Sequence, residues 1–173
     1  KGERIGEKYM RYLYYPGCSL EGTALEYNLA TRSVMHKVGA ELVEIEDWTC
    51  FAASAAEATS QLLSLALPAR NIAIAERMAD VNDILVPCSA CYLNLKKVEE
   101  KTRKDQILLN QLNSILAEEQ LEVKGTIRVR HLLDVIANDV GAQKIRSLVH
   151  KPLNAFNIAP YYGCQCLRPY PVF

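Results

Sequence analysis

The sequence lacks an excess of either charge and any long apolar run, and these absences exclude several classes of protein. It has 20 basic and 20 acidic residues in 173, so no general positive field is available to hold nucleic acid non-specifically. No apolar stretch reaches the roughly 18 residues that a membrane-spanning helix needs. Residues 1–8 are charged and lack the apolar stretch of a signal peptide. We therefore expect a cytoplasmic protein without a nucleic-acid partner or a membrane span.

The short motifs of several enzyme classes are missing as well. The chain has no glycine-rich phosphate-binding loop, no HExxH zinc motif and no nucleophile elbow. It has instead six cysteines and a hydrophobic content of 50%, which is enough to bury a core. In a reducing cytoplasm, cysteines at organised spacings favour metal binding or redox chemistry over structural disulfides.

Strand-like and helix-like segments alternate along the chain. We expect strands over residues 9–15, 41–45, 83–87 and 153–161. We expect helices over residues 24–38 and 53–80, from a start between 89 and 92, and over 105–121, 129–140 and 143–149. Pro68 is expected to divide the segment 53–80 into two helices. This alternation predicts an α/β fold, with a mainly parallel sheet flanked by helices.

Three cysteines each follow a predicted strand directly or after a short loop. They are Cys18, Cys50 and Cys88, and Cys91 completes a Cys-Ser-Ala-Cys motif with the last of them. Ligand sites of parallel sheets lie beyond the carboxyl ends of the strands, so we expect all four thiols at one edge of the sheet. Four thiolates can hold zinc or a four-iron cluster. A thiol–disulfide pair at Cys88 and Cys91, or buried structural cysteines, are the alternatives.

A short repeat indicates a second module near the end of the chain. An aromatic pair, a glycine and a cysteine close the first strand at residues 14–18, and the same residue types recur at residues 161–164. In this interpretation Cys164 has the role of Cys18. We therefore expect a flexible tail at residues 1–8, a first domain at 9–152 and the truncated start of a second domain at 153–173. A truncated module would leave apolar surface uncovered and favour self-association.

Four segments carry a specific resemblance to a known family. Residues Tyr14–Leu20, Glu44–Cys50 and Val86–Tyr92 resemble the cysteine-rich CCG domain found in the B-type subunit of heterodisulfide reductase and in its relatives. Residues Tyr161–Pro169 resemble the start of the second CCG domain of that subunit. The resemblance extends over nearly the whole chain and is strongest at these four segments.

The resemblance implies a set of ligands and a departure from the family pattern. A complete CCG motif has five cysteines that hold a noncubane four-iron cluster, and Cys18, Cys50, Cys88 and Cys91 match four of them. Where the family has Cys-Cys-Gly, this chain has Cys50-Phe51-Ala52. Four cysteines remain, which is enough for a cubane 4Fe–4S cluster or, alternatively, a tetrahedral zinc ion. The second site, with Cys164 and Cys166 alone, is incomplete.

The family also implies a function. Its members reduce a disulfide substrate with electrons from partner subunits that carry flavin and iron–sulfur clusters. We therefore predict a redox subunit of a heterodisulfide-reductase-like complex, inactive as an isolated chain. A non-catalytic scaffold or zinc-binding module of such a complex is one alternative, and an independent thiol–disulfide oxidoreductase is the other.

A few further residues have two interpretations. Trp48 either shields the metal site from water or packs in the core. His36, His131 and His150 are interpreted as surface residues. Arg128, Arg130, Lys144 and Arg146 form a locally basic stretch, which is interpreted as a solvated helix face, with a docking surface for an acidic partner as the alternative.

Overall fold

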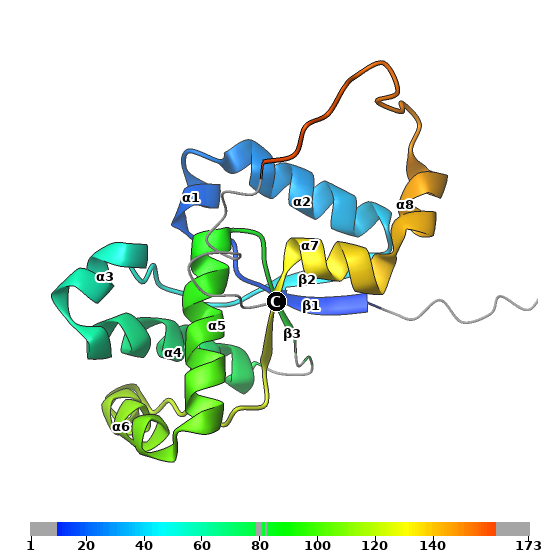
Figure 1. The fold of residues 1–173 in the computed structure, drawn as a ribbon. Helices are drawn as coiled ribbons and strands as arrows, with labels where there is room; N and C mark the ends of the chain where they lie inside the picture. Colours follow the sequence, from blue (N-terminus) through cyan, green and yellow to red (C-terminus); the bar gives the residue numbers. More distant parts are fainter. Residues whose placement is uncertain (1–9, 79–80, 82, 162–173) are drawn as a thin grey trace, which may run out of the picture.

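The computed structural model describes residues 10–78, 81 and 83–161, and in these residues the predicted α/β fold is confirmed. All pairs of neighbouring strands are parallel, and the order across the sheet is β2-β1-β3-β4 (Figure 1). The strands are β1 (Met10–Tyr14), β2 (Ala40–Glu44), β3 (Asp83–Val86) and β4 (Arg128–His131).

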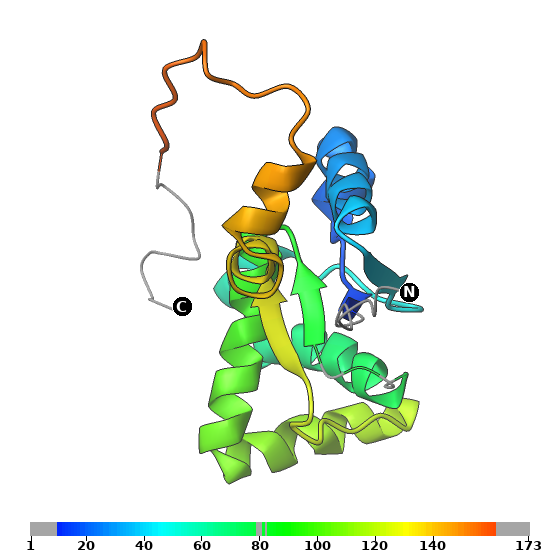
Figure 2. The same ribbon diagram turned by 90° about the vertical axis from the view of Figure 1, so that its right-hand side faces the viewer.

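Helices connect the strands and cover both faces of the sheet (Figures 1 and 2). The longer helices are α2 (Leu25–Lys37), α4 (Gln61–Arg77), α5 (Ser89–Lys104) and α6 (Gln106–Leu116). The shorter helices are α1 (Cys18–Glu21), α3 (Ala53–Thr59), α7 (Leu132–Val135) and α8 (Ala142–Leu148). A 3₁₀ turn (Ala117–Glu119) follows α6, and a π-helical turn (Ile136–Val140) joins α7 to α8.

The core has two parts, one on each face of the sheet. On one face, Leu13, Ile84 and Val86 pack with α4, α5 and α6. On the other face, Tyr14 and Leu85 pack with residues of α2 and α7. Consecutive residues of β3 are buried because they point alternately into the two parts. Strands covered on both faces are apolar without interruption, which is why residues 84–86 are recognisable as a strand from the sequence.

The prediction of the fourth strand was wrong. Residues 153–161, predicted as a strand, form no strand and are exposed throughout. The segment runs away from the packed layers in Figures 1 and 2. The fourth strand is β4, within a segment predicted to be helical from residue 129. Its alternation Arg128-Val129-Arg130-His131 is too short to compete with the helical spacing that follows, and the pairing of Ile84 with Val129 exists only in the folded sheet.

Pro68 does not divide the following helix, contrary to the prediction. Helix α4 continues through it, and the break lies earlier, at Ser60, whose hydroxyl caps α4 by accepting a hydrogen bond from the Leu63 N–H at 3.3 Å. Pro68 is buried in the core face, so packing outweighs the loss of one helical hydrogen bond. The predicted tail at 1–8 and the cysteines Cys164 and Cys166 lie outside the described residues, and the domain division stays a prediction.

Candidate metal and redox site

The carboxyl ends of three neighbouring strands bring four cysteines to one edge of the sheet. Cys18 begins α1 just after β1, Cys50 lies in the loop after β2, and Cys88 is the N-cap of α5 after β3. Cys91 lies in the first turn of α5. The sulfur atoms of Cys18 and Cys50 are 3.3 Å apart, although the residues are 32 positions apart in the chain. All four cysteines are free, with Cys18 and Cys50 exposed and Cys88 and Cys91 partly buried.

Gly17 lies where the loop after β1 approaches the start of α5. Its φ of 76° lies in the left-handed region that favours glycine, and a Cβ atom at this position would lie 2.7 Å from the Cys91 sulfur. The loop that carries Cys18 therefore approaches the first turn of α5 so closely that no other residue type fits without displacement. This approach places the pair Cys18–Cys50 beside the pair Cys88–Cys91.

An aromatic cluster forms the floor beneath the thiols. Tyr15 is 1% exposed, stacks on Phe51 with ring centroids 5.5 Å apart, and meets Trp48 edge-on at 5.1 Å. Its hydroxyl donates a hydrogen bond to the Thr49 carbonyl at 2.9 Å. Burial raises the pKa of Tyr15, and negative charge on the four thiols raises it further. All four thiols therefore lie near enough to this buried ring to affect its ionisation.

The two half-buried thiols differ in their protonation. Hydrogen bonds from the Cys91 thiol and from the backbone N–H groups of Ala90 and Cys91 lower the pKa of Cys88 to about 6, against the effect of burial. The same contact between the thiols, together with burial, raises the pKa of Cys91. The pKa of Cys18 is raised by its hydrogen bond with Cys50 and by burial. The start of α5 thus favours the thiolate form of Cys88, since anions are stabilised at the start of a helix.

The degenerate motif has a clear structural consequence. Phe51 is 3% exposed and belongs to the core, where it completes the aromatic floor. Ala52 has a φ of 54°, in the left-handed region that costs non-glycine residues about 1 kcal/mol or more. The backbone here keeps the conformation that a glycine would favour, although the glycine of the Cys-Cys-Gly pattern is absent.

The possible metal ligands at this edge of the sheet are the four thiols. Among residues 10–78, 81 and 83–161, no three His, Cys, Asp or Glu side chains are arranged to bind one metal ion. The Cys18 and Cys50 sulfurs form one close pair, and the Cys88 and Cys91 thiols form a second one. Four thiols at one edge of the sheet are the donor set of a four-iron cluster or of a tetrahedral zinc ion.

His131, interpreted from the sequence as a surface residue, is buried at 2% exposure. It ends β4, beside the strand that precedes Cys88. The prediction was wrong because basic residues such as Arg130 flank His131 in the sequence. In a strand, neighbouring side chains point to opposite faces, so His131 is buried although Arg130 is not part of the core. His36 and His150 are exposed, as predicted. Trp48 is half-buried and packs against the core beside Tyr15, so it covers one side of the site as well.

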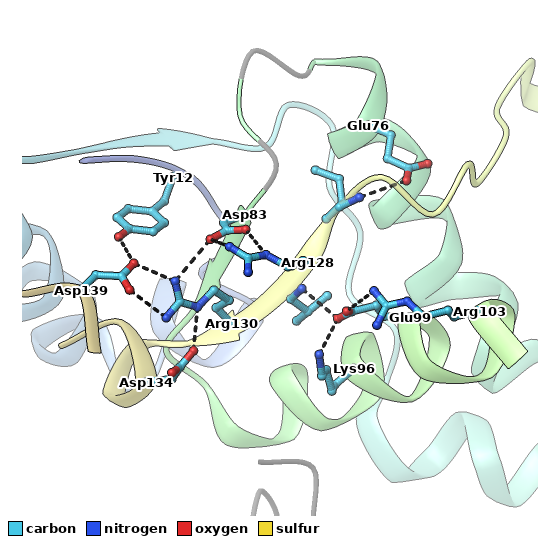
Figure 3. A network of polar contacts seen from close by, with 12 residues as sticks. Tyr12, Glu76, Asp83, Lys96, Glu99, Arg103, Arg128, Arg130, Asp134 and Asp139 are labelled. Carbon is cyan, nitrogen blue, oxygen red and sulfur yellow. Dashed lines mark hydrogen bonds and ion pairs between the residues drawn. The ribbon is translucent and has the colours of Figure 1, made fainter. Parts of the chain in front are cut away.

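The opposite end of the sheet carries a network of ion pairs (Figure 3). Arg130 contacts the carboxylates of Asp134 at 2.6 Å, Asp139 at 2.7 Å and Asp83 at 3.3 Å. Arg128 also pairs with Asp83, at 2.8 Å. Two members of the basic stretch therefore belong to β4 and are neutralised by carboxylates, which corrects their interpretation as a solvated helix face.

Comparisons with known proteins show which family and which proteins this chain resembles. Residues 12–96 match the family model of the cysteine-rich domain named CCG. The chain is 37% identical over 158 residues to the membrane anchor subunit of the 8-methylmenaquinol:fumarate reductase of Wolinella succinogenes, a match that covers 91% of this chain and 54% of that protein. It is 30% identical over 156 residues to the B-type subunit of the ferredoxin/F(420)H(2)-dependent CoB-CoM heterodisulfide reductase of Methanosarcina acetivorans, with 90% and 51% covered.

A third relative is more distant. A protein of Archaeoglobus profundus, named as similar to the B-type subunit of heterodisulfide reductase, is 24% identical over 165 residues, covering 95% of this chain and 54% of that protein. The chain thus spans about half the length of these relatives. One relative is named a membrane anchor, but none of the helices in the described part of this chain has the length and apolarity of a membrane span.

Proposed function

Residues 12–96 of this chain are a cysteine-rich domain of the CCG family, and on this premise we propose that Cys18, Cys50, Cys88 and Cys91 bind a 4Fe–4S cluster. The comparisons support a subunit of a redox complex. We further propose that the chain takes part in disulfide reduction or electron transfer in a heterodisulfide-reductase-like complex, in the cytoplasm. Its partners would be subunits that carry flavin and further iron–sulfur clusters.

One observation carries the proposal. Four free thiols from three strand ends lie near the buried Tyr15 ring, at the edge where parallel sheets bind their ligands. Thiolates are the ligands of iron–sulfur clusters. The Cys88 thiol loses its proton more readily than an ordinary thiol, because its pKa is lowered to about 6. A bound cluster would supply one-electron transfer, which no side chain of this site supplies by itself.

The surrounding residues have distinct roles in this proposal. Tyr15, Trp48 and Phe51 exclude water from the inner side of the site. Gly17 allows the close approach of the two ligand pairs. Cys18 and Cys50 are exposed, so the outer side remains accessible to a disulfide substrate or to a partner subunit.

The Cys88–Cys91 pair supports a second candidate function. A low-pKa cysteine at a helix N-terminus, with its partner two residues further on, is also the arrangement of thiol–disulfide oxidoreductases. In that case Cys88 would attack a disulfide and Cys91 would resolve the mixed disulfide, so that the substrate is reduced by two electrons and Cys88–Cys91 becomes a disulfide. Activity of metal-free protein with a dithiol reductant would favour this function.

Elemental analysis of protein purified without oxygen tests the cluster. We expect iron and acid-labile sulfide in equal amounts, a brown colour and little zinc. The variants Cys88→Ser and Cys91→Ser should lose the iron. Cys166→Ser is the matched control, because it also removes one thiol but leaves the proposed ligands intact, and it should retain the iron.

The result also separates the alternatives. Colourless protein with one equivalent of zinc, lost in Cys88→Ser, would identify the zinc-binding scaffold. Protein without either metal, even after anaerobic reconstitution with iron and sulfide, would refute the proposed cluster.

A further inference from the structure

His131 is a buried polar side chain next to the proposed ligands. It ends β4 and pairs in register with Val86, so it lies beside the strand that leads to Cys88. The residue is 2% exposed. A buried imidazole is stable only when its ring nitrogens have hydrogen-bonding partners, so the contacts of this ring indicate its role.

The two ring nitrogens connect β4 to different elements. Nδ1 accepts a hydrogen bond from the Leu133 N–H at 3.2 Å, which makes His131 the N-cap of α7. In the neutral ring the proton then lies on Nε2, which faces the Ser89 hydroxyl oxygen at 3.4 Å. The ring also meets Tyr92 edge-on, with centroids 5.3 Å apart. Burial lowers the pKa of His131 and so favours the neutral ring, against the opposing effects of a hydrogen bond with the Pro87 backbone and of the Asp134 charge.

The contacts of the His131 ring with Ser89 and Tyr92 both lie on the turn that carries the proposed ligands Cys88 and Cys91. Ser89 follows Cys88 directly, and Tyr92 follows Cys91. The Tyr92 N–H donates to the Cys88 carbonyl at 2.8 Å and closes this turn. A rotation of the turn would move both sulfurs together, so a contact on Ser89 and Tyr92 restrains both ligands.

Hydrogen bonds and ion pairs hold strand β4, which carries His131. The buried Glu99 carboxylate accepts a hydrogen bond from the Val129 N–H of β4 at 2.9 Å and pairs with Lys96 at 2.8 Å (Figure 3). Next to His131 on the same strand, Arg130 is held by three carboxylates. A side chain on such a strand can hold a neighbouring turn in one orientation.

We propose that His131 is a positioning residue, which holds the Cys88–Cys91 turn through Ser89 and Tyr92 in the orientation that presents both thiols to the cluster. This inference rests on the proposed function of the same site. Residues that orient metal ligands without binding the metal commonly change metal affinity by about tenfold or more when they are replaced.

Three variants separate positioning from packing. His131→Asn keeps an acceptor for the Leu133 N–H, since asparagine is a good N-cap, but its side chain is too short to reach Ser89. His131→Gln places an amide N–H near the position of Nε2 and loses the cap. Ser89→Ala removes only the hydroxyl group. If His131 positions the turn, His131→Asn and Ser89→Ala should behave alike, and His131→Gln should be closer to the wild type.

The first measurement is the loss of iron from the reconstituted full chain to a chelator. We expect His131→Asn and Ser89→Ala to lose iron about tenfold faster than the wild type, with an altered electron paramagnetic resonance spectrum. His131→Gln should have a lower melting temperature but a rate of loss near that of the wild type. Unchanged rates and spectra in His131→Asn and Ser89→Ala would overturn the proposal and leave His131 as a helix cap alone.

The second measurement uses metal-free protein, so its outcome does not depend on the cluster. The alkylation rate of Cys88 by iodoacetamide, relative to that of Cys18 in the same sample, should change in His131→Asn and Ser89→Ala and be restored in His131→Gln. A constant ratio in all three variants would contradict the positioning role. If the wild type binds no iron, the proposed function fails, and this ratio still decides whether His131 holds the turn.

Discussion

The two ends of the sheet are built from different chemistry. At the amino end, Arg130 contacts three carboxylates, and Arg128 shares one of them (Figure 3). The Tyr12 hydroxyl donates to Asp139 at 2.5 Å, and with its burial this contact raises the pKa of Tyr12. At the carboxyl end, four free thiols lie over an aromatic floor, and two of them are exposed.

The difference indicates which end stabilises the fold and which end binds a ligand. Charged groups that are already paired with one another are poor ligands for a further ion. These pairs instead hold β1, β3 and β4 together. The four free thiols are held close in spite of the cost of bringing several ionisable groups together. Such an arrangement is favoured when a positively charged group binds between them. The amino end is therefore structural, and the carboxyl end is the proposed site.

The strongest test of this contrast is the replacement of Arg130 by methionine. The Arg130 side chain is 13% exposed, and its loss removes the guanidinium that pairs with Asp134 and Asp139, while Asp83 keeps its pair with Arg128. We expect the free energy of unfolding to fall by about 4 kcal/mol, measured by urea denaturation. Arg146→Met, at an exposed position on α8, is the matched control and should change stability little. The folded fraction of Arg130→Met should still bind iron, because all four proposed ligands are present.

The double variant Phe51→Cys, Ala52→Gly tests the carboxyl end. Loss of the buried ring should cost about 3 kcal/mol of stability, while the added thiolate should increase the iron content or change the cluster spectrum after anaerobic reconstitution. Ala52→Gly alone is the control: it relieves the left-handed backbone at φ 54° and should leave the iron content unchanged. A double variant that folds without any change in iron or spectrum would show that the site does not use a fifth thiolate.

Gly17→Ala should disturb both the fold and the site. The positive φ and the 2.7 Å approach to the Cys91 sulfur predict a loss of about 2 kcal/mol in the free energy of unfolding, together with weaker retention of iron. Gly39 also has a positive φ but no atom within 4 Å of the position of a Cβ. Gly39→Ala should therefore lower stability without affecting iron, and equal iron loss in both variants would contradict the role of Gly17.

The pH dependence of alkylation should distinguish the thiols of metal-free protein. The pKa of Cys88 is lowered to about 6, so its thiolate fraction and alkylation rate should rise about tenfold between about pH 5 and pH 7. The raised pKa of Cys18 predicts that its rate rises only in more alkaline solution. Mass spectrometry of the labelled peptides measures both rates, and a common pH profile for the two residues would contradict the geometry at α5.

The smallest expected effect is weak self-association through the exposed segment after α8. Leu153, Phe156 and Ile158 are 60–69% exposed, and apolar side chains in such numbers favour contacts between molecules. We expect sedimentation velocity to detect dimers at high protein concentration and fewer of them in Phe156→Ser. Lys151→Ser, in the same exposed segment, is the control. A monomer at every concentration would refute the expectation.

The fold class and the grouping of the cysteines could be predicted from local sequence patterns. Residues 12–15 and 84–87 are buried without interruption, so their apolar composition identifies them as strands. Residues 41–45 are recognisable by the apolar Leu42, Val43 and Ile45. Because parallel strands end at the same edge, the cysteines that follow them had to lie together. Both conclusions depend on short-range patterns, which the linear sequence records.

The fourth strand and the burial of His131 depend on packing between distant residues. Strand β4 has four residues with two arginines, and it exists because the sheet edge and the Glu99 carboxylate complete its hydrogen bonds. The apolar residues 153–161 find no such partner and stay exposed. His131 is buried because Ser89, Tyr92 and Leu133 surround its ring. Contacts with β3 and α5 join residues about 40 positions apart in the chain, and a local sequence pattern contains no record of them.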